Sequence, residues 1–358
     1  MVVTKKIAVL CNYELLPERV GGMDYFFWLF DAKCKQNNIQ IDWFFPNNSN
    51  YGEYPNLTVI NCNYEEVQIF FNQNYSNQNY SHIITHFIEL CTPFFKSIKK
   101  KTKAKIIAVD HNPRPINGYP FKKKLEKKVK GFLYSKFIDV FVGVSTYSKN
   151  QICIEFGSQI KNKSIIIFNG IKAEKYLQKT DFNFKGKFIV ACHLRKDKGI
   201  QDLITAVHEI QKQFPLHFTV DIYGKGDYQV ILEDAIHNFS LQNIFNFKGN
   251  VTNLNELYGQ YDYLIHPSHG ETFCYSVVES LLSTLPVITT KNQGNVLGLV
   301  IENENGFLFE ECDTKKLSEI ISSIISNNIS ISDFSQNNSE IVKLSLDSMV
   351  ENYYKLLL

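Results

Sequence analysis

The sequence lacks several features that would place it in a familiar class of protein. No run reaches the about eighteen apolar residues that a membrane-spanning helix needs, and residues 1–12 lack the apolar stretch and cleavage site of a signal peptide. The eight cysteines form no C-x-x-C pair, which argues against a zinc site and for reduced thiols in a cytoplasm. The net charge is only +2, so we expect no nucleic-acid partner.

Length and pattern predict two domains. At 358 residues the chain is too long for one ordinary core. Short apolar, β-branched runs alternate with helical periodicity in both halves, which is typical of Rossmann-like α/β domains with doubly wound sheets. We place the first domain at residues 1–170, the second at 171–340 and a closing helix at 341–358, with the polar stretch 172–187 as a linker.

The individual elements follow from the same periodicity. We expect strands at residues 7–11, 39–45, 57–60, 83–85, 106–109, 140–144, 165–168, 188–192, 218–223, 244–248, 263–266, 287–290 and 306–309. We expect helices at residues 23–36, 121–137, 146–156, 200–213, 228–237, 275–285, 314–326 and 341–357, and a surface loop at 72–81.

The most informative stretch is residues 263–290, which read as strand, loop, helix and strand. Glu271 lies in the loop at the carboxyl end of the first strand, where open α/β sheets bind ligands. Glu279 projects from the first turns of the following helix. The helix start leaves backbone N–H groups free to hold a phosphate or sugar hydroxyl, at Phe273, Cys274 and Tyr275.

These residues resemble the retaining glycosyltransferases of the GT-B superfamily, specifically family four (glycosyl transferases group 1). The hallmark E-x7-E is present at Glu271 and Glu279, and residues 285–288, L-P-V-I, stand at the matching places of the small-x-P-V-I stretch that follows it. The resemblance implies two Rossmann-like domains facing each other across a cleft, with the last helix crossing back to the first domain. It also implies that Glu271 contacts the donor sugar and that Glu279 binds the ribose hydroxyls of the nucleotide. The alternative is that both are solvated surface acids.

Two positions depart from the family pattern. The family often has Gly at the places of Thr272 and Cys274. We therefore expect a donor-sugar pocket that is narrower or more polar than usual.

A basic loop, residues 193–199, follows the strand 188–192. Lys198 matches the family lysine that grips the pyrophosphate, whereas His193 stands at the place of the earlier basic residue, so we infer that Arg195 takes over that contact. No D-x-D triplet occurs in the chain, which fits catalysis without a metal, with fixed cations stabilising the leaving diphosphate. The alternative, a solvated basic helix start, opposes the helix dipole.

Further candidates follow from the resemblance and are also readable as plain turns or caps. Gly21 and Gly22 resemble the glycine-rich loop that approaches the donor phosphate, and no G-x-G-x-x-G follows the first strand, which counts against an NAD enzyme. His111 stands where the family often places a histidine near the donor sugar. Gly224 and Val251 match turns near the nucleoside and the base.

The segment 121–137 combines an apolar stripe with many lysines. This pattern suits docking on an anionic membrane surface, with Lys123, Lys127 and Lys130 on the cationic face. The alternative is a solvated helix packed normally on its sheet.

The sequence thus predicts a glycosyltransferase that moves a sugar from a nucleotide diphosphate sugar, with UDP favoured, to a saccharide or lipid-linked hydroxyl acceptor with retention. Bacterial surface polysaccharide or glycolipid assembly is the expected setting, in the cytoplasm and peripherally on the inner face of the membrane. No separate cofactor and no metal are expected. The alternatives are an epimerase or phosphorylase on the same fold, or a non-catalytic partner that only binds a nucleotide sugar.

Overall fold

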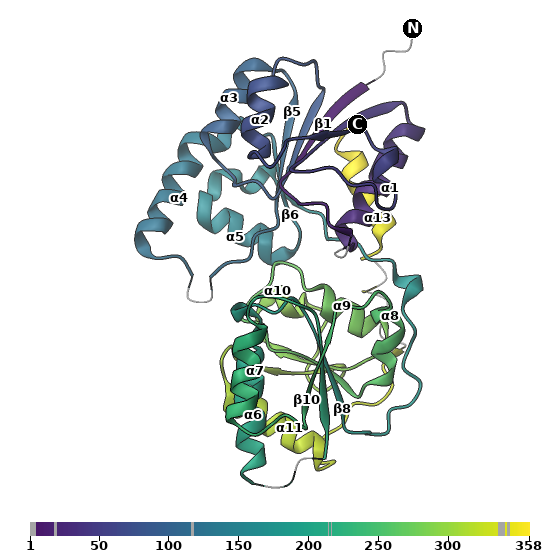
Figure 1. Ribbon diagram of the computed structural model, residues 1–358. Coiled ribbons are helices and arrows are strands. Elements are labelled where there is room, and N and C mark those ends of the chain that lie inside the picture. Colours follow the sequence, from purple (N-terminus) through teal and green to yellow (C-terminus); the bar gives the residue numbers. More distant parts are fainter. Residues whose placement is uncertain are drawn as a thin grey trace. The chain divides into compact units, whose positions relative to one another are not determined.

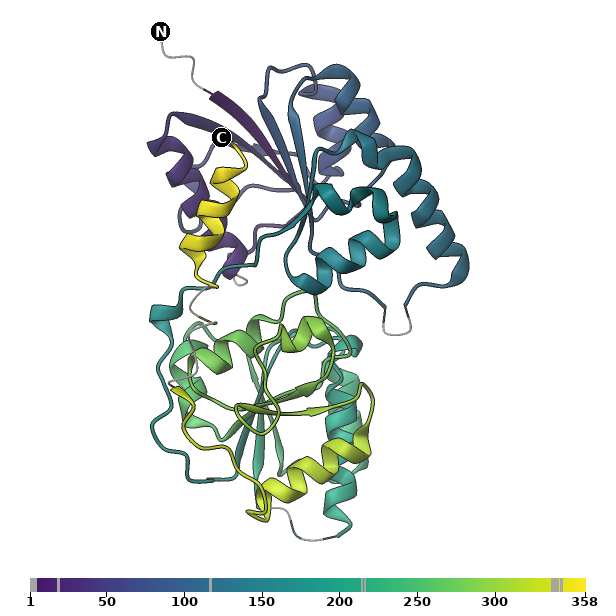
Figure 2. The ribbon, with the colours of Figure 1, turned by 180° about the vertical axis from the view of Figure 1, so that it is seen from behind.

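The computed structural model describes residues 5–17, 20–115, 118–213, 215, 217–335, 341 and 344–358. The chain divides into two compact units. Unit 1 comprises Met1–Ile171 and Leu344–Leu358, and unit 2 comprises Lys172–Lys343. Each unit has one parallel sheet with helices on both of its faces (Figure 1, Figure 2).

The sheet of unit 1 has seven strands in the order β3-β2-β1-β4-β5-β6-β7, and every neighbouring pair is parallel. The strands are β1 (Lys5–Cys11), β2 (Ile39–Phe45), β3 (Val59–Asn61), β4 (His82–His86), β5 (Lys105–Asp110), β6 (Val140–Gly143) and β7 (Ser164–Ile166). The helices are α1 (Gly22–Gln36), α2 (Val67–Asn74), α3 (Pro93–Lys101), α4 (Phe121–Tyr134), α5 (Thr146–Phe156) and α13 (Leu346–Lys355). The central strands β1 and β4 are buried almost throughout because both faces of the sheet are covered.

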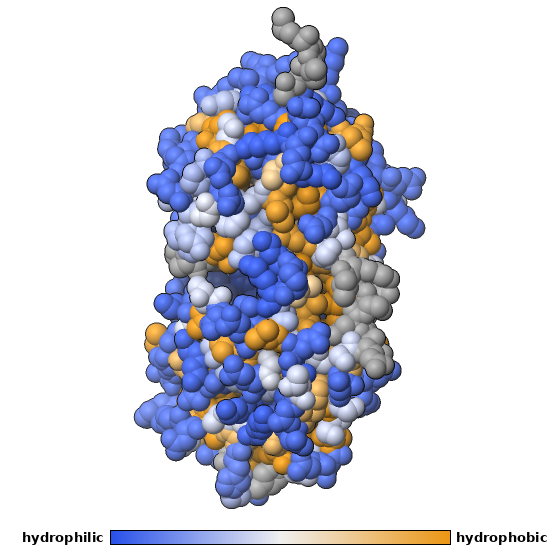
Figure 3. Space-filling view, turned by 90° about the vertical axis from the view of Figure 1, so that its right-hand side faces the viewer, coloured by the Kyte–Doolittle hydropathy of each residue, from blue (hydrophilic) through white to orange (hydrophobic). Residues whose placement is uncertain are grey.

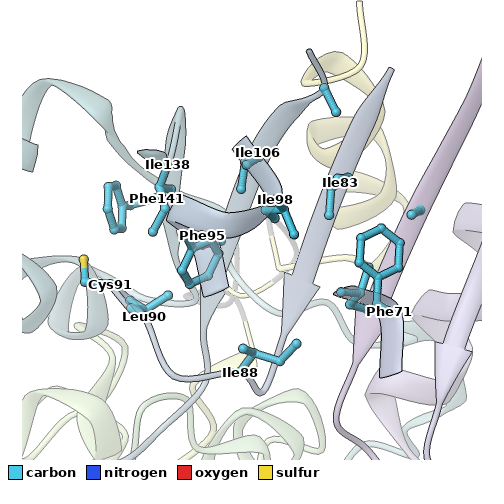
Figure 4. Packing of buried hydrophobic residues seen from close by; sticks show 14 of the residues in the cluster. Phe71, Ile83, Ile88, Leu90, Cys91, Phe95, Ile98, Ile106, Ile138 and Phe141 are labelled. Carbon is cyan, nitrogen blue, oxygen red and sulfur yellow. The ribbon is translucent and has the colours of Figure 1, made fainter. Parts of the chain in front are cut away.

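A large apolar cluster lies between the sheet of unit 1 and helices α2, α3 and α5 (Figure 4). Phe71 comes from α2, Phe95 from α3 and Phe156 from α5, and all three are buried. Ile83 of β4 and Ile106 of β5 belong to the same cluster and are labelled in Figure 4. Helices α2 and α3 were not predicted: α2 covers part of the segment 72–81 that we expected to be a loop, and its buried Val67 and Phe71 explain why it forms.

The other face of this sheet holds the closing helix of the chain. Helix α13 lies beside α1 (Figure 1), with the ring of Tyr353 4.8 Å from that of Phe26 and 6.1 Å from that of Phe30. Where the chain returns, Ile171 and Ser345 form a parallel bridge. The predicted crossing of the last helix back to the first domain is therefore confirmed; residues 342–343 of the expected helix lie outside the described residues.

The sheet of unit 2 has six parallel strands in the order β10-β9-β8-β11-β12-β13. The strands are β8 (Lys187–Ala191), β9 (Thr219–Tyr223), β10 (Phe245–Gly249), β11 (Tyr263–His266), β12 (Val287–Thr290) and β13 (Gly306–Phe309). The helices are α6 (Ile200–Gln211), α7 (Gln229–Asn238), α8 (Leu254–Leu257), α9 (Tyr275–Leu282), α10 (Gln293–Val296) and α11 (Thr314–Ile325). The predicted fold class, two Rossmann-like α/β domains, is confirmed.

The polar stretch 172–187 is not a free linker. Leu177 donates its N–H to the carbonyl of Asn255, and Lys179 donates its N–H to that of Ser283. The Lys179 ammonium is buried and donates to the carbonyl of Tyr261 at 2.5 Å. This segment is therefore part of unit 2, held by backbone contacts that residue polarity does not reveal.

The surface on the side of α1 and α13 carries hydrophobic residues interspersed among hydrophilic ones (Figure 3). Within the described residues, no helix combines the length and the apolar character needed to cross a membrane.

Candidate functional site

In unit 2 the strand order reverses between β8 and β11, which are parallel neighbours in the sheet: β9 and β10 follow on the side of β8, and β12 and β13 on the side of β11. The loops after these two strands therefore begin at one place on the carboxyl edge of the sheet, where open α/β folds bind ligands. The loop after β8 carries Lys198, and the loop after β11 carries Glu271. The two most specific site residues predicted from the sequence are thus brought together.

Gly199 lets the two loops approach. Its φ of +69° lies in the left-handed region, and a Cβ atom there would lie 2.0 Å from the carbonyl oxygen of Pro267. The N–H of His269 donates to the carbonyl of Asp197 at 2.9 Å and fastens the same two loops. The glycine after Lys198 is therefore required by packing.

Lys198 and Glu271 form a direct ion pair between Nζ and Oε1. The Lys198 side chain is 8% exposed and that of Glu271 16%. Burial opposes both charges, but the partners outweigh it: His266 and Lys198 lower the pKa of Glu271 to about 2, and Glu271 raises that of Lys198. The site thus holds a fixed anion beside a fixed cation at neutral pH.

Three further side chains surround the Glu271 carboxylate, and the sequence did not single out two of them. The His266 Nε2 lies 3.5 Å from Oε1, and the Ser268 hydroxyl donates to the same oxygen at 3.3 Å. The Cys274 Sγ lies 3.2 Å from the His266 Nε2. The sequence H-P-S at residues 266–268 could have indicated His266 and Ser268, because it puts two polar side chains at the carboxyl end of β11.

Glu279 occupies a different environment on α9. The Tyr258 hydroxyl donates to its Oε2 at 2.8 Å. Burial raises the pKa of the Glu279 carboxyl, and hydrogen bonds from Tyr258 and Tyr176 offset part of the rise. The two acids of E-x7-E therefore differ: one is held by a cation and the other by phenol hydroxyls.

The start of α9 is formed by the residues that the sequence proposed for backbone binding. Cys274 is the buried N-cap residue, and Tyr275 is the first residue of the helix. Phe273 is buried beside Tyr275, with ring centroids 5.0 Å apart. The Cys274 side chain makes no capping hydrogen bond to this helix start.

Arg195 lies in the same loop as Lys198 and is far more exposed. Its side chain is 49% exposed, and its Nη2 lies 3.0 Å from Oδ2 of Asp197. Asp197 also lies 4.0 Å from the Lys198 ammonium. Arg195 is thus near the predicted place but directed to a surface carboxylate.

The turns after β9 and β10 lie at the same edge of the sheet. At Gly224, whose φ is +132°, a Cβ atom would lie 1.9 Å from the carbonyl oxygen of Cys192. Gly224 donates its N–H to the carbonyl of Gly249 at 2.9 Å. Val251 follows and is exposed. Packing therefore explains why a glycine stands at position 224. The predicted roles of Gly224 near the nucleoside and of Val251 near the base stay predictions.

His111 belongs to unit 1, directly after β5. It is buried, its Nε2 lies 2.9 Å from the Nδ1 of His86, and its ring stacks on Phe87 with centroids 4.1 Å apart. Burial lowers the pKa of His111 to about 3 and places that of His86 well below its ordinary value. Both imidazoles are neutral at physiological pH, and His86 fixes the ring that the sequence proposed as a sugar contact.

The loop after His111 is fastened by buried charges. Arg114 lies 2.6 Å from Asp110 and 2.7 Å from Glu155, and all three side chains are at most 7% exposed. Lys127 of α4 contacts the same Glu155 at 3.0 Å. This network of two cations and two anions joins the His111 loop to α5 and α4, and sequence reasoning missed it because Glu155 is remote in the chain.

Gly21 and Gly22 lie at the start of α1. The N–H of Gly21 donates to the Asp24 carboxylate at 2.9 Å, and a Cβ atom on Gly21 would meet nothing within 4 Å. The conformation of Gly21 is extended, with φ of −150°, which any residue adopts. The predicted approach of a phosphate at these glycines remains a prediction.

Two groups of side chains could offer ligand atoms to a metal. Within the part of the chain that the structure describes, Asp202, His269 and Cys312 have such atoms within 4.8 Å of one another, as do His266, Glu271 and Cys274. In the second group Glu271 is already bound to Lys198, whose positive charge would repel a cation.

Comparisons with known proteins agree with this arrangement. Residues 173–341 match the family described as glycosyl transferases group 1. The chain is 29% identical over 207 residues to an uncharacterized glycosyltransferase of Methanocaldococcus jannaschii, covering 57% of this chain and 55% of that protein. It is 28% identical over 173 residues to the GtfA subunit of a UDP-N-acetylglucosamine–peptide N-acetylglucosaminyltransferase of Streptococcus pneumoniae, covering 48% of this chain and 34% of that protein. The chain thus spans about half, or less, of the length of these relatives.

Solved structures show the same fold at low sequence identity. A glycosyltransferase from Rickettsia africae has a TM-score of 0.75 and 17% identity, covering 99% of this chain and 98% of that one. The HepE protein of Anabaena in complex with UDP and glucose has a TM-score of 0.74 and 18% identity, covering 99% of each chain.

These matches define the fold of the two units as GT-B. Residues 173–341, which lie within unit 2, are similar to the glycosyl transferases group 1 family. The resemblance that the E-x7-E motif indicated is confirmed.

Proposed function

We propose that the protein is a retaining glycosyltransferase that moves a sugar from a nucleotide diphosphate sugar to a hydroxyl acceptor. The observation that supports this proposal best is the Lys198–Glu271 ion pair, which lies where the strand order of the unit 2 sheet reverses. It lies inside the segment that matches glycosyl transferases group 1.

The polarity of the pair suits the polarity of the reaction. As the glycosidic bond breaks, positive charge develops on the sugar ring and negative charge on the departing diphosphate. Glu271 would position the sugar and stabilise its charge, while Lys198 would stabilise the diphosphate. The diphosphate itself would help to deprotonate the acceptor on the same face of the sugar, which gives retention.

The remaining roles are assigned on the same basis. Glu279 would accept hydrogen bonds from the ribose hydroxyls, and the start of α9 would offer backbone N–H groups to the donor. Arg195 would turn from Asp197 to the diphosphate. His111 would contact the donor sugar as a neutral imidazole, held in place by His86.

We assign no metal to the reaction. The ammonium of Lys198 occupies the position beside Glu271 that a cation would take, and it supplies the same positive charge. Activity should therefore persist in EDTA. Complete loss of activity in EDTA, restored by Mn²⁺ or Mg²⁺, would show that this part of the proposal is wrong.

The relatives favour a UDP-sugar donor, and we propose a saccharide or lipid-linked acceptor. The Streptococcus pneumoniae relative takes UDP-N-acetylglucosamine by its name, and the Anabaena structure contains UDP and glucose. A further relative, from Bacillus subtilis, is named a poly(glycerol-phosphate) alpha-glucosyltransferase. We propose surface polysaccharide or glycolipid assembly as the setting, with the protein in the cytoplasm and peripheral on the inner face of the membrane.

A thermal-shift screen against nucleoside diphosphates and their sugars, followed by donor hydrolysis assays, tests the function. We expect UDP and UDP-sugars to raise the melting temperature and slow release of UDP from the matching donor. Release of a sugar phosphate with inorganic phosphate as acceptor would indicate a phosphorylase, and interconversion of UDP-sugars an epimerase. Binding without any turnover, with or without saccharide acceptors, would indicate a binding partner instead.

A further inference from the structure

Helix α4 of unit 1 packs on the protein through its polar side. Its buried residues are Lys127 and Gly131. Gly131 lies directly on α5, since a Cβ atom there would lie 1.9 Å from the carbonyl oxygen of Phe156. The Lys127 ammonium lies 3.0 Å from Glu155 and 4.4 Å from the ring centre of Tyr119. The inner face of this helix is therefore a lysine and a glycine.

The apolar side chains of α4 are on the opposite side. At 100° per residue, their positions fall in one stripe turned away from Lys127 and Gly131. All are exposed: Phe121 by 83%, Phe132 by 79%, Leu125 by 55%, Val129 by 49% and Leu133 by 45%. Figure 1 and Figure 2 both show α4 at the outer edge of unit 1. The alternative of a helix packed on its sheet by its apolar stripe is wrong, because that stripe faces solvent.

The lysines of α4 divide into two sets. Lys123 is ion-paired with Glu126 at 3.1 Å, and Lys130 lies 2.8 Å from both Glu89 and Glu126. With Lys127, these were the residues expected to form the cationic face, and the structure instead places them in ion pairs. The exposed lysines are Lys122, Lys124 and Lys128. At 100° per residue, Lys122 falls within the stripe, Lys128 falls at its edge beside Phe121, and Lys124 falls farther round the helix.

We propose that α4 docks unit 1 on an anionic lipid surface, with the apolar stripe entering the boundary between headgroups and acyl chains and Lys122, Lys124 and Lys128 contacting the phosphates. A helix with an exposed apolar face and exposed lysines has the composition of an interfacial helix. Long lysine side chains can reach headgroup phosphates while their carbon chains lie along the apolar boundary. The proposal does not depend on the reaction or on the nucleotide site.

The charge distribution favours lipid over a second copy of the chain. Two α4 helices packed by their stripes would bring the same lysines together, and like charges at an apolar contact are unfavourable. An anionic membrane instead supplies both an apolar phase and negative charge in one surface.

Co-sedimentation with vesicles tests the proposal. We expect the protein to bind vesicles of phosphatidylcholine mixed with phosphatidylglycerol, to bind phosphatidylcholine alone much more weakly, and to lose binding as salt rises. The combined substitution of Phe121, Leu125 and Phe132 by Ser should abolish binding. The combined substitution of Lys122, Lys124 and Lys128 by Glu should lower the partition coefficient by about 100-fold or more, at about fivefold for each lysine.

A matched control separates the stripe from general surface changes. Val230 and Ile231 of α7 in unit 2 are 64% and 52% exposed, so Val230→Ser with Ile231→Ser makes the same kind of change elsewhere. This control should bind vesicles like the parent. Insertion itself is read from Phe132→Trp, whose emission should shift to shorter wavelength with anionic vesicles, whereas that of Val230→Trp should not.

Two results would overturn the proposal. One is equal sedimentation of the parent and the stripe variant with anionic vesicles. The other is a parent that is dimeric without lipid and a stripe variant that is monomeric, which would identify a second copy as the occupant. Circular dichroism and melting temperature should match between the variants and the parent, because the changed side chains are on the exposed side of α4.

Discussion

Lys198 and Glu271 each keep the other charged in a site that is mostly closed to water. We expect Lys198→Ala to lower kcat/KM by about 10², the scale known for removing one group that stabilises a developing anion. Arg195→Ala should cost less, because Arg195 is half-exposed and already paired with Asp197. Steady-state kinetics on the matching UDP-sugar measures both. A larger loss for Arg195→Ala would reverse the assignment of the main diphosphate contact.

Glu279 should act on the nucleotide whatever sugar is attached. We expect Glu279→Gln to weaken binding of free UDP by about tenfold or more, the scale of a hydrogen bond to a charged group. Titration calorimetry with UDP measures this directly. Glu271→Gln is the control, since its effect should appear in turnover with the affinity for UDP nearly unchanged. Parent-like binding by Glu279→Gln would exclude the ribose role.

At the scale of the element, two glycines that look equivalent in sequence should behave differently. Gly131→Ala forces a Cβ atom into the backbone of α5 and should destabilise unit 1 by about 1 to 3 kcal/mol, the range for overpacking. Gly21→Ala meets no atom within 4 Å and should change stability by no more than about 0.5 kcal/mol. Urea unfolding measures both.

The same Gly21→Ala variant tests a predicted site residue. If backbone at Gly21 approaches the donor phosphate, this variant should lose turnover while keeping the stability of the parent. Unchanged turnover would leave Gly21 as an ordinary helix start.

Single elements show which structural features can be predicted from the sequence. The strands β11, β12 and β13 begin and end where the sequence predicted, because each is a short buried apolar run bounded by Pro, Gly or polar residues. The periodicity of α4 predicted an apolar stripe but not which side faces the protein. That choice is made by Glu155, which draws Lys127 inward, and by the backbone of α5, which only Gly131 can approach.

The candidate site follows the same rule. The positions of Glu271, Glu279 and Lys198 were predictable because each is set by its spacing from a strand, and their roles stay predictions. The pairing of His86 with His111 was not, because β4 and β5 place them side by side from separate parts of the sequence.

At the scale of the whole molecule, acid should affect unit 1 through its buried histidines. Burial lowers the pKa of His111 to about 3 and that of His82 to about 4, from 6.5, and also lowers that of His86. Because the folded values lie below the unfolded one, the stability is full above about pH 6.5 and falls as pH drops below it. Each histidine contributes a loss of about 1.4 kcal/mol per pH unit in that window.

Thermal unfolding from about pH 7.5 to about pH 5.5 checks this expectation. The melting transition should fall across the window, and hydrogen exchange should rise first in peptides of unit 1. His111→Asn should make the pH dependence shallower by one proton. A melting temperature that does not change with pH over this range would contradict the neutral, buried state of the histidines.

Unit 2 is an insertion in the chain of unit 1, and the parallel bridge between Ile171 and Ser345 joins the two ends of unit 1 that flank it. The chain leaves unit 1 after Ile171 and returns to unit 1 at Leu344. The N–H of Ile171 donates to the carbonyl of Leu344 at 2.9 Å. A chimera in which the corresponding segment of a relative replaces residues 172–343 therefore has two junctions that lie next to each other. Neither junction interrupts a strand of the unit 1 sheet. If unit 2 binds the donor as we propose, this replacement should change donor specificity and leave α4 unchanged.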